Sequence, residues 1–380
     1  MRILVTSDTY LPRLGGGEYH VAYLLKELRT MGHEVTLVTT EKGNDPADQN
    51  VIRVPYRGML SFPKLFSVLR NEAKNADIIH SHYSFRLAWV AGIVARMQKK
   101  PFVITQHGMG LLPQVNATFL QRLAFSIWRS GSMKRADTII STSEDMSVVV
   151  RELGFGSKIV PITNGYDPER FTPLPSAQFD PPVLLTVRRL VPKTGIQYLV
   201  AALPILKKKH PALRHICIGE GRAKEQIVEL ARTLGVSDMI TFLGPVDHAH
   251  LIEYYAQASI VVLPSTAESS SLTCIEAMAL GRIVVASRVG GLIELIGKNE
   301  ERGFLVSLTE SEHSSYDAPF TLPQERIRAL ADRISYALTH WEEATQKAQT
   351  AAAYAPSHFA WPILVGRTVK EVYEPLLRHS

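Results

Sequence analysis

The chain has 380 residues, and with 46% hydrophobic and 21% charged residues it has the composition of a globular protein with room for two domains. Its formal net charge of +6 suits anionic partners, namely nucleic acid, acidic lipid or phosphorylated substrates, without choosing among them. Its two cysteines, Cys217 and Cys274, exclude a disulfide framework and indicate a reducing compartment.

Short apolar segments alternate with longer amphipathic ones along the first half of the chain. We expect strands at residues 2–6, 34–39, 77–80, 101–106 and 138–142. We expect helices between them at residues 18–31, 62–74, 85–98, 119–135 and 144–153. A strand followed by a helix, repeated, predicts βαβ units and a parallel sheet with helices on both faces.

The alternation stops near Asn164, and the polar, proline-rich stretch that follows as far as Pro182 predicts a linker. It then restarts with strands expected at residues 183–187, 214–218, 239–242, 259–263 and 283–286. The accompanying helices are expected at residues 195–209, 222–234, 248–256 and 271–280, with one more helix from Ser357 to Leu377. The pattern predicts two doubly wound α/β domains, with the ligand site at the carboxyl ends of the strands in a cleft between them.

The most informative segment lies between Leu263 and Gly281, directly after an apolar strand. Ser270 or Ser271 is a natural N-cap for the helix that follows, and the free amides of a helix N-terminus form an anion site. Glu268 precedes this helix and Glu276 lies in its second turn, so two carboxylates that accept hydrogen bonds flank the anion site. The spacing also fits two ordinary acidic residues at a helix start, and by itself it favours that interpretation.

This segment resembles the E-x7-E motif of retaining glycosyltransferases with the two-domain GT-B fold, specifically the large family four. The family pattern has Pro-Ser, then Glu, then Glu-Ala-Met-Ala-x-Gly, and here Pro264-Ser265 and Glu268 stand ahead of Glu276-Ala277-Met278-Ala279. Arg282-Ile283 departs from the usual Pro-Val, and serines replace a common Gly-Phe-Gly. Neither change touches the two carboxylates.

Further stretches resemble the same family in chain order. They are the glycine loop Leu14-Gly15-Gly16-Gly17-Glu18, the histidine turn Gln106-His107-Gly108, the signature Asn164-Gly165-Tyr166-Asp167 with Arg170-Phe171, and Phe242-Leu243-Gly244 beside the nucleotide base. The resemblance implies an acceptor-binding N-terminal domain at residues 1–170, onto which the helix at 360–380 packs back. It implies a donor-binding C-terminal domain at residues 171–359.

The resemblance also implies roles for residues. Glu276 should bind the ribose hydroxyls of the donor, Glu268 should hold hydroxyls of the transferred sugar, and amides around the helix start should face the diphosphate or the hexose. The donor-binding set that we expect is Gly16, Gly17, Arg188, Gly219, Leu243, Ser270, Ser271, Leu272 and Glu276, and the catalytic set is His107, Glu268, Arg189 and Lys193.

One departure from the family concerns the cations that neutralise the leaving diphosphate. The family commonly has Arg-Leu-x-x-x-Lys-Gly, and here Arg189 falls on its arginine whereas Thr194 falls where the lysine belongs. We expect Lys193 or Arg188 to substitute, since losing one such contact costs about 3 kcal/mol of transition-state stabilisation.

The histidines allow two interpretations. A lone histidine such as His107 is as often structural as functional, and the resemblance places it near the transferred sugar. His80-x-His82 at a strand end offers two imidazoles to zinc, but no third ligand is evident in the sequence. We therefore expect no metal site, and no cofactor besides the donor substrate.

Two basic stretches favour contact with an anionic membrane. Residues 119–135 combine Phe119, Leu120 and Trp128 with four cations and no acid, and residues 53–74 carry five cations, Arg57 among them, against one acid. A core-facing helix with a solvated basic edge fits equally well. No signal peptide and no apolar run of about 18 residues is evident, so we expect a cytoplasmic protein, peripheral at most on the inner face of the membrane.

The resemblance implies a metal-independent, retaining transferase that moves a sugar from a UDP- or GDP-sugar to an acceptor hydroxyl. The acceptor expected is a cell-envelope glycan, as in polysaccharide or lipopolysaccharide synthesis, or a lipid-linked glycan, and no nucleic acid partner is expected. The alternatives are a related GT-B protein acting as an epimerase or phosphorylase, and a nucleotide-sugar-binding protein without turnover.

Overall fold

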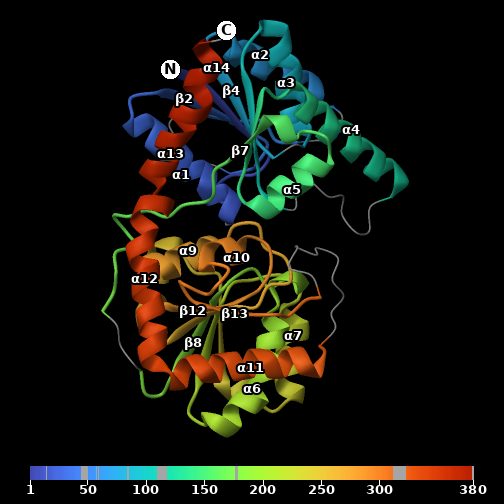
Figure 1. Ribbon diagram of the computed structural model, residues 1–380. Helices are drawn as coiled ribbons and strands as arrows, with labels where there is room; N and C mark the ends of the chain where they lie inside the picture. The colour runs from blue at the N-terminus through green and yellow to red at the C-terminus, as the bar shows by residue number, and fades with distance from the viewer. Residues whose placement is uncertain are drawn as a thin grey trace. The chain divides into compact units, whose positions relative to one another are not determined.

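The computed structural model describes residues 1–13, 15–43, 50–56, 58, 60–83, 85–108, 118–175, 179–310 and 322–378. The chain forms two compact units (Figure 1). The first unit consists of Met1–Gly165 and Trp361–Ser380, and the second unit consists of Tyr166–Ala360. Arg57, one of the predicted membrane-facing cations, lies outside the described residues.

Within the described residues, the first unit contains a seven-stranded parallel sheet in the order β3-β2-β1-β4-β5-β6-β7. The strands are β1 (Arg2–Ser7), β2 (Glu34–Thr39), β3 (Val51–Arg53), β4 (Ile78–His82), β5 (Phe102–Gln106), β6 (Thr138–Ser141) and β7 (Ile159–Pro161). The helices are α1 (Gly16–Thr30), α2 (Phe62–Ala73), α3 (Arg86–Gln98), α4 (Phe119–Arg135), α5 (Glu144–Glu152), α13 (Trp361–Arg367) and α14 (Glu374–Arg378), with a π-helical turn at Thr368–Tyr373. Helices cover both faces of this sheet (Figure 1).

The second unit contains, in the part of it that is described, a six-stranded parallel sheet in the order β10-β9-β8-β11-β12-β13. The strands are β8 (Val183–Val187), β9 (Arg214–Ile218), β10 (Ile240–Gly244), β11 (Ile260–Leu263), β12 (Ile283–Ser287) and β13 (Phe304–Val306). The helices are α6 (Ile196–Lys209), α7 (Lys224–Thr233), α8 (Leu251–Gln257), α9 (Leu272–Ala279), α10 (Gly291–Ile296), α11 (Gln324–Thr339) and α12 (Trp341–Phe359). Helices α6, α7 and α11 pack on one face and α8, α9 and α10 on the other, and α12 contributes side chains to both clusters.

The sequence explains why the central strands lie where they do. Strands β4, β5, β11 and β12 are buried along their whole length. Continuous burial of this kind is typical of parallel strands covered by helices on both faces. The predicted α/β class with two doubly wound sheets is confirmed, since both sheets reverse their strand order beside the first strand of the unit.

The prediction of one helix from Ser357 to Leu377 is wrong at Ala360, where α12 ends and the backbone is extended. Pro362 has no N–H to continue the helical hydrogen bonds. The carbonyl oxygen of Phe359 instead accepts from the backbone N–H of Tyr166 at 2.9 Å. The break separates α12 of the second unit from α13 of the first.

Candidate functional site

The second unit concentrates charged side chains where its strand order reverses, between β8 and β11. In a doubly wound sheet this switch point leaves a crevice at the carboxyl ends of the two strands, where such folds bind ligands. Arg188 and Arg189 directly follow β8, and Glu268 lies in the loop that follows β11. The helix α9 begins four residues after Glu268 and fixes the end of that loop.

Arg188 and Glu268 form an ion pair in which the guanidinium donates to the carboxylate, and both side chains are almost fully buried. Burial alone would raise the pKa of Glu268, but the charges of Arg188 and Lys193 and the hydrogen bond from Arg188 hold that pKa below its usual value. Glu268 is therefore ionised at neutral pH.

Lys193 lies in the same group of charges, on a 3₁₀ turn at Pro192–Thr194. Burial lowers the pKa of its amine to about 8, against the opposing effect of the Glu268 carboxylate. Thr194, at the position of the family's lysine, is buried, and its hydroxyl donates to the carbonyl oxygens of Arg189 at 2.8 Å and Val191 at 2.7 Å. Thr194 thus shapes the turn, and the neighbouring Lys193 supplies a cation close to Glu268.

Helix α9 begins after the loop that follows β11, at the same end of the sheet as Arg188. Ser271 is its N-cap, with a side-chain oxygen that accepts from the backbone N–H of Cys274 at 3.3 Å. Ser270 and Ser271 are both buried, and Leu272 is the first helical residue. The hydroxyl of Thr273 donates to the carbonyl oxygen of Val187 at 2.8 Å, which ties the helix start to the end of β8.

Glu276 is buried in α9 and both of its carboxylate oxygens are engaged. His248 Nε2 lies 2.6 Å from Oε1, and the hydroxyl of Tyr255 donates to Oε2 at 2.9 Å. The Arg170 guanidinium lies 3.3 Å from His248 Nδ1 and can only donate, so His248 accepts there and donates its Nε2–H to Glu276. Sequence reasoning missed His248 and Tyr255, because each precedes Glu276 by about twenty or more residues and carries no motif.

Gly219 directly follows β9, the strand next to β8, and Leu243 lies on β10, the strand next to β9. Gly219 has a φ of +131°, and a Cβ there would lie 1.9 Å from the carbonyl oxygen of Arg188, so only glycine allows this approach. Leu243, on the edge strand β10, is 39% exposed.

The remaining predicted residues belong to the first unit. Gly16 and Gly17 begin α1, and a Cβ on Gly17 would lie 2.0 Å from the hydroxyl oxygen of Tyr83. His107 follows β5, and its Nε2 lies 2.9 Å from Nδ1 of His82, the last residue of β4. Gly16 and Gly17 are thus in a different unit from the other residues assigned to the donor.

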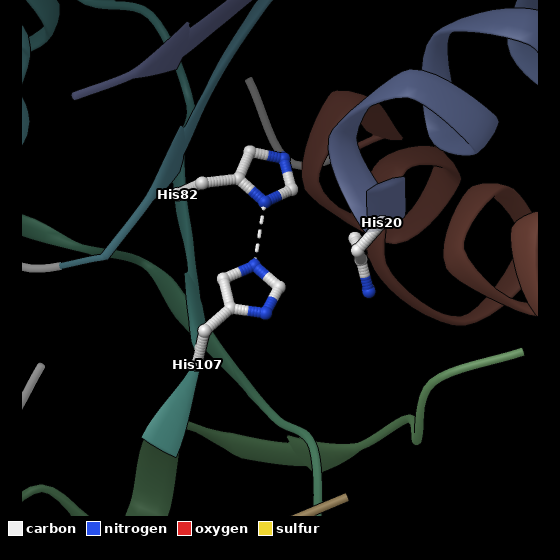
Figure 2. A group of neighbouring side chains, drawn as sticks. All are labelled: His20, His82 and His107. Atoms are coloured by element: carbon white, nitrogen blue, oxygen red, sulfur yellow. Dashed lines mark hydrogen bonds between the residues drawn. The ribbon is translucent and has the colours of Figure 1, made fainter. Parts of the chain in front are cut away.

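The structure shows why His80-x-His82 is not a metal-binding pair. His80 uses both ring nitrogens, to Tyr373 at 2.6 Å and to Thr105 at 2.7 Å. A third imidazole does stand near His82 and His107, namely His20 from α1 (Figure 2). His20 escaped sequence analysis because it is more than 60 residues from its neighbours.

Comparisons with known proteins identify the family of this chain. The model of Glycosyltransferase Family 4 matches residues 14–170, and that of Glycosyl transferases group 1 matches residues 175–354. D-inositol 3-phosphate glycosyltransferase 2 of Catenulispora acidiphila is 30% identical over 332 residues, which cover 73% of this chain and 75% of that protein. The phosphatidylinositol N-acetylglucosaminyltransferase gpi3 subunit of Schizosaccharomyces pombe is 24% identical, over 98% of this chain and 80% of that protein.

Among solved structures, Anabaena Alr3699/HepE in complex with UDP-glucose superposes with a TM-score of 0.79 and 20% identity, over 98% of this chain and 100% of that chain. This likeness shows the shared fold. With two family models that adjoin along the sequence and a named glycosyltransferase at 30% identity, the chain belongs to glycosyltransferase family 4 and is a transferase with the GT-B fold.

Proposed function

We propose that this glycosyltransferase moves a sugar from a nucleoside-diphosphate sugar to an acceptor hydroxyl with retention of anomeric configuration. The observation that carries the proposal is the buried pair of Arg188 and Glu268, with the half-buried Lys193 beside it, at the switch point of the second unit. Cations, a carboxylate and a helix N-terminus in one crevice match the charges and hydroxyls of a nucleotide-sugar.

In this proposal the diphosphate lies against Arg188, Arg189, Lys193 and the first amides of α9. The leaving diphosphate gains negative charge as the glycosidic bond breaks, and fixed cations in a buried site stabilise that charge. These side chains supply the positive charge, so we propose that transfer requires no metal at the diphosphate.

We assign the ribose hydroxyls to Glu276 and the hydroxyls of the transferred sugar to Glu268. A carboxylate has about four lone-pair positions, so Glu276 keeps acceptor capacity besides its bonds from His248 and Tyr255. Those two bonds hold the carboxylate in one orientation, and the ribose meets a preorganised acceptor.

We propose that the configuration is retained because the acceptor hydroxyl attacks the sugar from the same face that the diphosphate leaves. The charge of Glu268 is compensated by Arg188, which weakens this carboxylate as a nucleophile. The acceptor hydroxyl then passes its proton to the leaving phosphate, with His107 near the transferred sugar.

We propose a glycan or lipid-linked acceptor of the cell envelope, reached at an anionic membrane surface. The Schizosaccharomyces pombe relative is a phosphatidylinositol N-acetylglucosaminyltransferase subunit, and the solved structure of Alr3699/HepE is a complex with UDP-glucose. None of the described helices has the length and apolarity to cross a bilayer. Helix α4 exposes Phe119 by 78%, Leu120 by 73% and Ile127 by 52%, beside four cations and no acid, as a helix lying on acidic lipid would.

The test is a donor panel on the purified protein in EDTA. We expect one of the UDP- or GDP-sugars to raise the melting temperature and to bind with 1:1 stoichiometry. With that donor, NMR of the product formed on an envelope glycolipid extract should show the anomeric configuration of the donor. Binding without any transfer would favour the nucleotide-sugar-binding alternative, and an inverted product would refute the assigned mechanism.

A further inference from the structure

Three histidines from separate elements meet in the first unit. His82 ends β4, His107 follows β5, and His20 comes from α1 (Figure 2). One ring nitrogen from each lies within 4.8 Å of the other two. The ring planes of His82 and His107 are nearly parallel at 15°, and His20 stands edge-on to both, at 65° and 77°.

The hydrogen bonds fix which nitrogens are available to a ligand. His20 Nδ1 lies 2.8 Å from Asn164 Oδ1, and because an amide oxygen only accepts, Nδ1 carries the proton and Nε2 carries the lone pair. His82 Nδ1 and His107 Nε2 face each other at 2.9 Å, with a single proton between them. The other nitrogen of His82, Nε2, is buried and has no hydrogen-bond partner among the described residues.

We propose that His20, His82 and His107 bind one Zn²⁺ ion through three imidazole nitrogens, with water at the fourth position. Imidazole is a preferred zinc ligand, and three protein ligands plus water form an open tetrahedral site. The protein that takes up the ion keeps one proton on each ring, on the nitrogen that faces away from the metal. The proton shared by His82 Nδ1 and His107 Nε2 moves to the outer nitrogen of the ring that carries it, which is Nε2 in His82 or Nδ1 in His107.

The required movement is small. Zinc–nitrogen bonds of 2.0–2.1 Å in a tetrahedron place the nitrogens roughly 3.4 Å apart. The nitrogens His82 Nδ1 and His107 Nε2, which lie 2.9 Å apart, must therefore move slightly apart. The most distant pair of ligand nitrogens, which lie at most 4.8 Å apart, must move closer together. The proposal assigns these differences to rotations of the three rings about their side-chain torsions.

The surroundings keep the three rings in the form that binds metal. His20 and His82 are buried, and Nε2 of His20 keeps its lone pair because Nδ1 donates to Asn164. Asn164 orients His20 in the way that outer partners orient zinc ligands. His107 is half-buried, which gives an ion a route to the group.

A zinc ion at this site would bind the imidazole of His107. Its expected effect on sugar transfer rests on the proposed function. If His107 lies near the transferred sugar, an ion bound to it removes the imidazole from the reaction. Zinc is then a reversible inhibitor, and a chelator restores transfer. Metal binding itself does not depend on which sugar or acceptor the enzyme uses.

The experiment uses the full chain, stripped with EDTA and dialysed. Isothermal titration with ZnCl₂ should give one ion per chain, and Co²⁺ should give the visible absorption bands of a four-coordinate nitrogen site. His20→Gln and His107→Gln should each weaken binding at least tenfold, and Asn164→Ala should weaken it by about 10- to 100-fold. His33→Gln, a half-buried histidine elsewhere in the first unit, is the matched control and should bind as the parent does.

Melting curves in EDTA show whether each variant is folded. If a variant does not fold, the cobalt spectrum of the unaltered protein still decides, since a six-coordinate spectrum overturns the proposal. Absence of a stoichiometric site, or unchanged affinity in folded His107→Gln, overturns it as well. Zinc that binds as expected without inhibiting transfer leaves the metal site intact and refutes the position of His107 in the proposed function.

Discussion

The guanidinium of Arg188 donates to the carboxylate of Glu268 in a buried pair, with only 8% and 12% of the two side chains exposed. Neither residue belongs to a helix or strand. Because both side chains are buried, the pair should affect the stability of the second unit as well as its chemistry. Removing one partner leaves the other charged and desolvated, which costs far more than the net contribution of the pair.

We therefore predict that Arg188→Ala lowers the free energy of unfolding by about 3–5 kcal/mol. Turnover at saturating donor should fall by about 100-fold or more, because a cation beside the leaving diphosphate is lost. Urea unfolding and a product assay measure the two effects. The double variant Arg188→Met with Glu268→Gln should recover stability without activity; a single variant as stable as the parent would contradict the buried pair.

Lys193 should make donor binding depend on pH. With a pKa of about 8, its amine is charged at pH 7 and loses the charge as the pH rises through 8. Affinity for a nucleoside diphosphate should fall above pH 8, by up to about tenfold per pH unit where the charged form is required. Calorimetric titrations from pH 7 to 9.5 measure this, and Lys193→Arg should abolish the dependence. If the affinity of Lys193→Arg falls with pH as steeply as that of the parent protein, another group is responsible for the pH dependence.

Glu276→Gln should weaken donor binding by about tenfold or more, since hydrogen bonds to a charged group contribute about 1.5–3 kcal/mol. Tyr255→Phe is the matched control, because it removes only the hydroxyl that orients Oε2. It should have a smaller effect in the same titration. Unchanged affinity in Glu276→Gln would remove the ribose assignment.

Helix α4 should direct the protein to acidic lipid. Replacing Leu120, Leu123 and Ile127 with serine removes exposed apolar surface while keeping all four cations. Cosedimentation with vesicles containing phosphatidylglycerol should fall several-fold, and donor binding should not change. Val228→Ser with Leu234→Ser, two exposed apolar side chains of the second unit, should leave sedimentation unaltered. Equal binding to neutral vesicles would contradict the role of the cations.

His215 should make the second unit sensitive to acid. Burial lowers the pKa of this imidazole to about 3, so the unfolded chain binds a proton below pH 6.5 that the folded chain does not. Its contribution to stability is full above pH 6.5 and falls by about 1.4 kcal/mol per pH unit on acidification towards pH 3. His215→Gln should flatten that part of the profile in chemical unfolding from pH 7 to 4. If the stability of His215→Gln falls with pH in parallel with that of the parent protein, the acid sensitivity does not come from His215.

The sequence predicted most of the strands because the central strands are continuous apolar runs followed by amphipathic helices. It did not predict β3, β7 or β13, each of three residues, which is too short for a periodicity. It also missed α10, α11 and α12, and the buried stripe of α12 consists largely of the alanines Ala344, Ala348, Ala351 and Ala355. Alanine contrasts weakly with polar neighbours, so the stripe gives a faint pattern.

The candidate site divides in the same way. Glu268, Ser271 and Glu276 belong to one continuous segment, where a strand end and a helix start are visible in the sequence. His248 and His20 become relevant only through tertiary contacts, to Glu276 and to His107. No local pattern marks such residues, because their partners are far away in the sequence and a sequence pattern covers only neighbouring residues.

The return of residues 361–378 to the first unit has a consequence during protein synthesis. Trp361 and Tyr373 are buried in that unit, yet the 195 residues of Tyr166–Ala360 are translated before they emerge. At about 5–20 residues per second the ribosome needs roughly 10–40 s for that stretch. Throughout this interval the nascent first unit lacks its last helices, whereas the second unit is contiguous and completes first. The enzyme is thus expected to fold its later-encoded half before its earlier one, with an apolar face that chaperones can bind in the meantime.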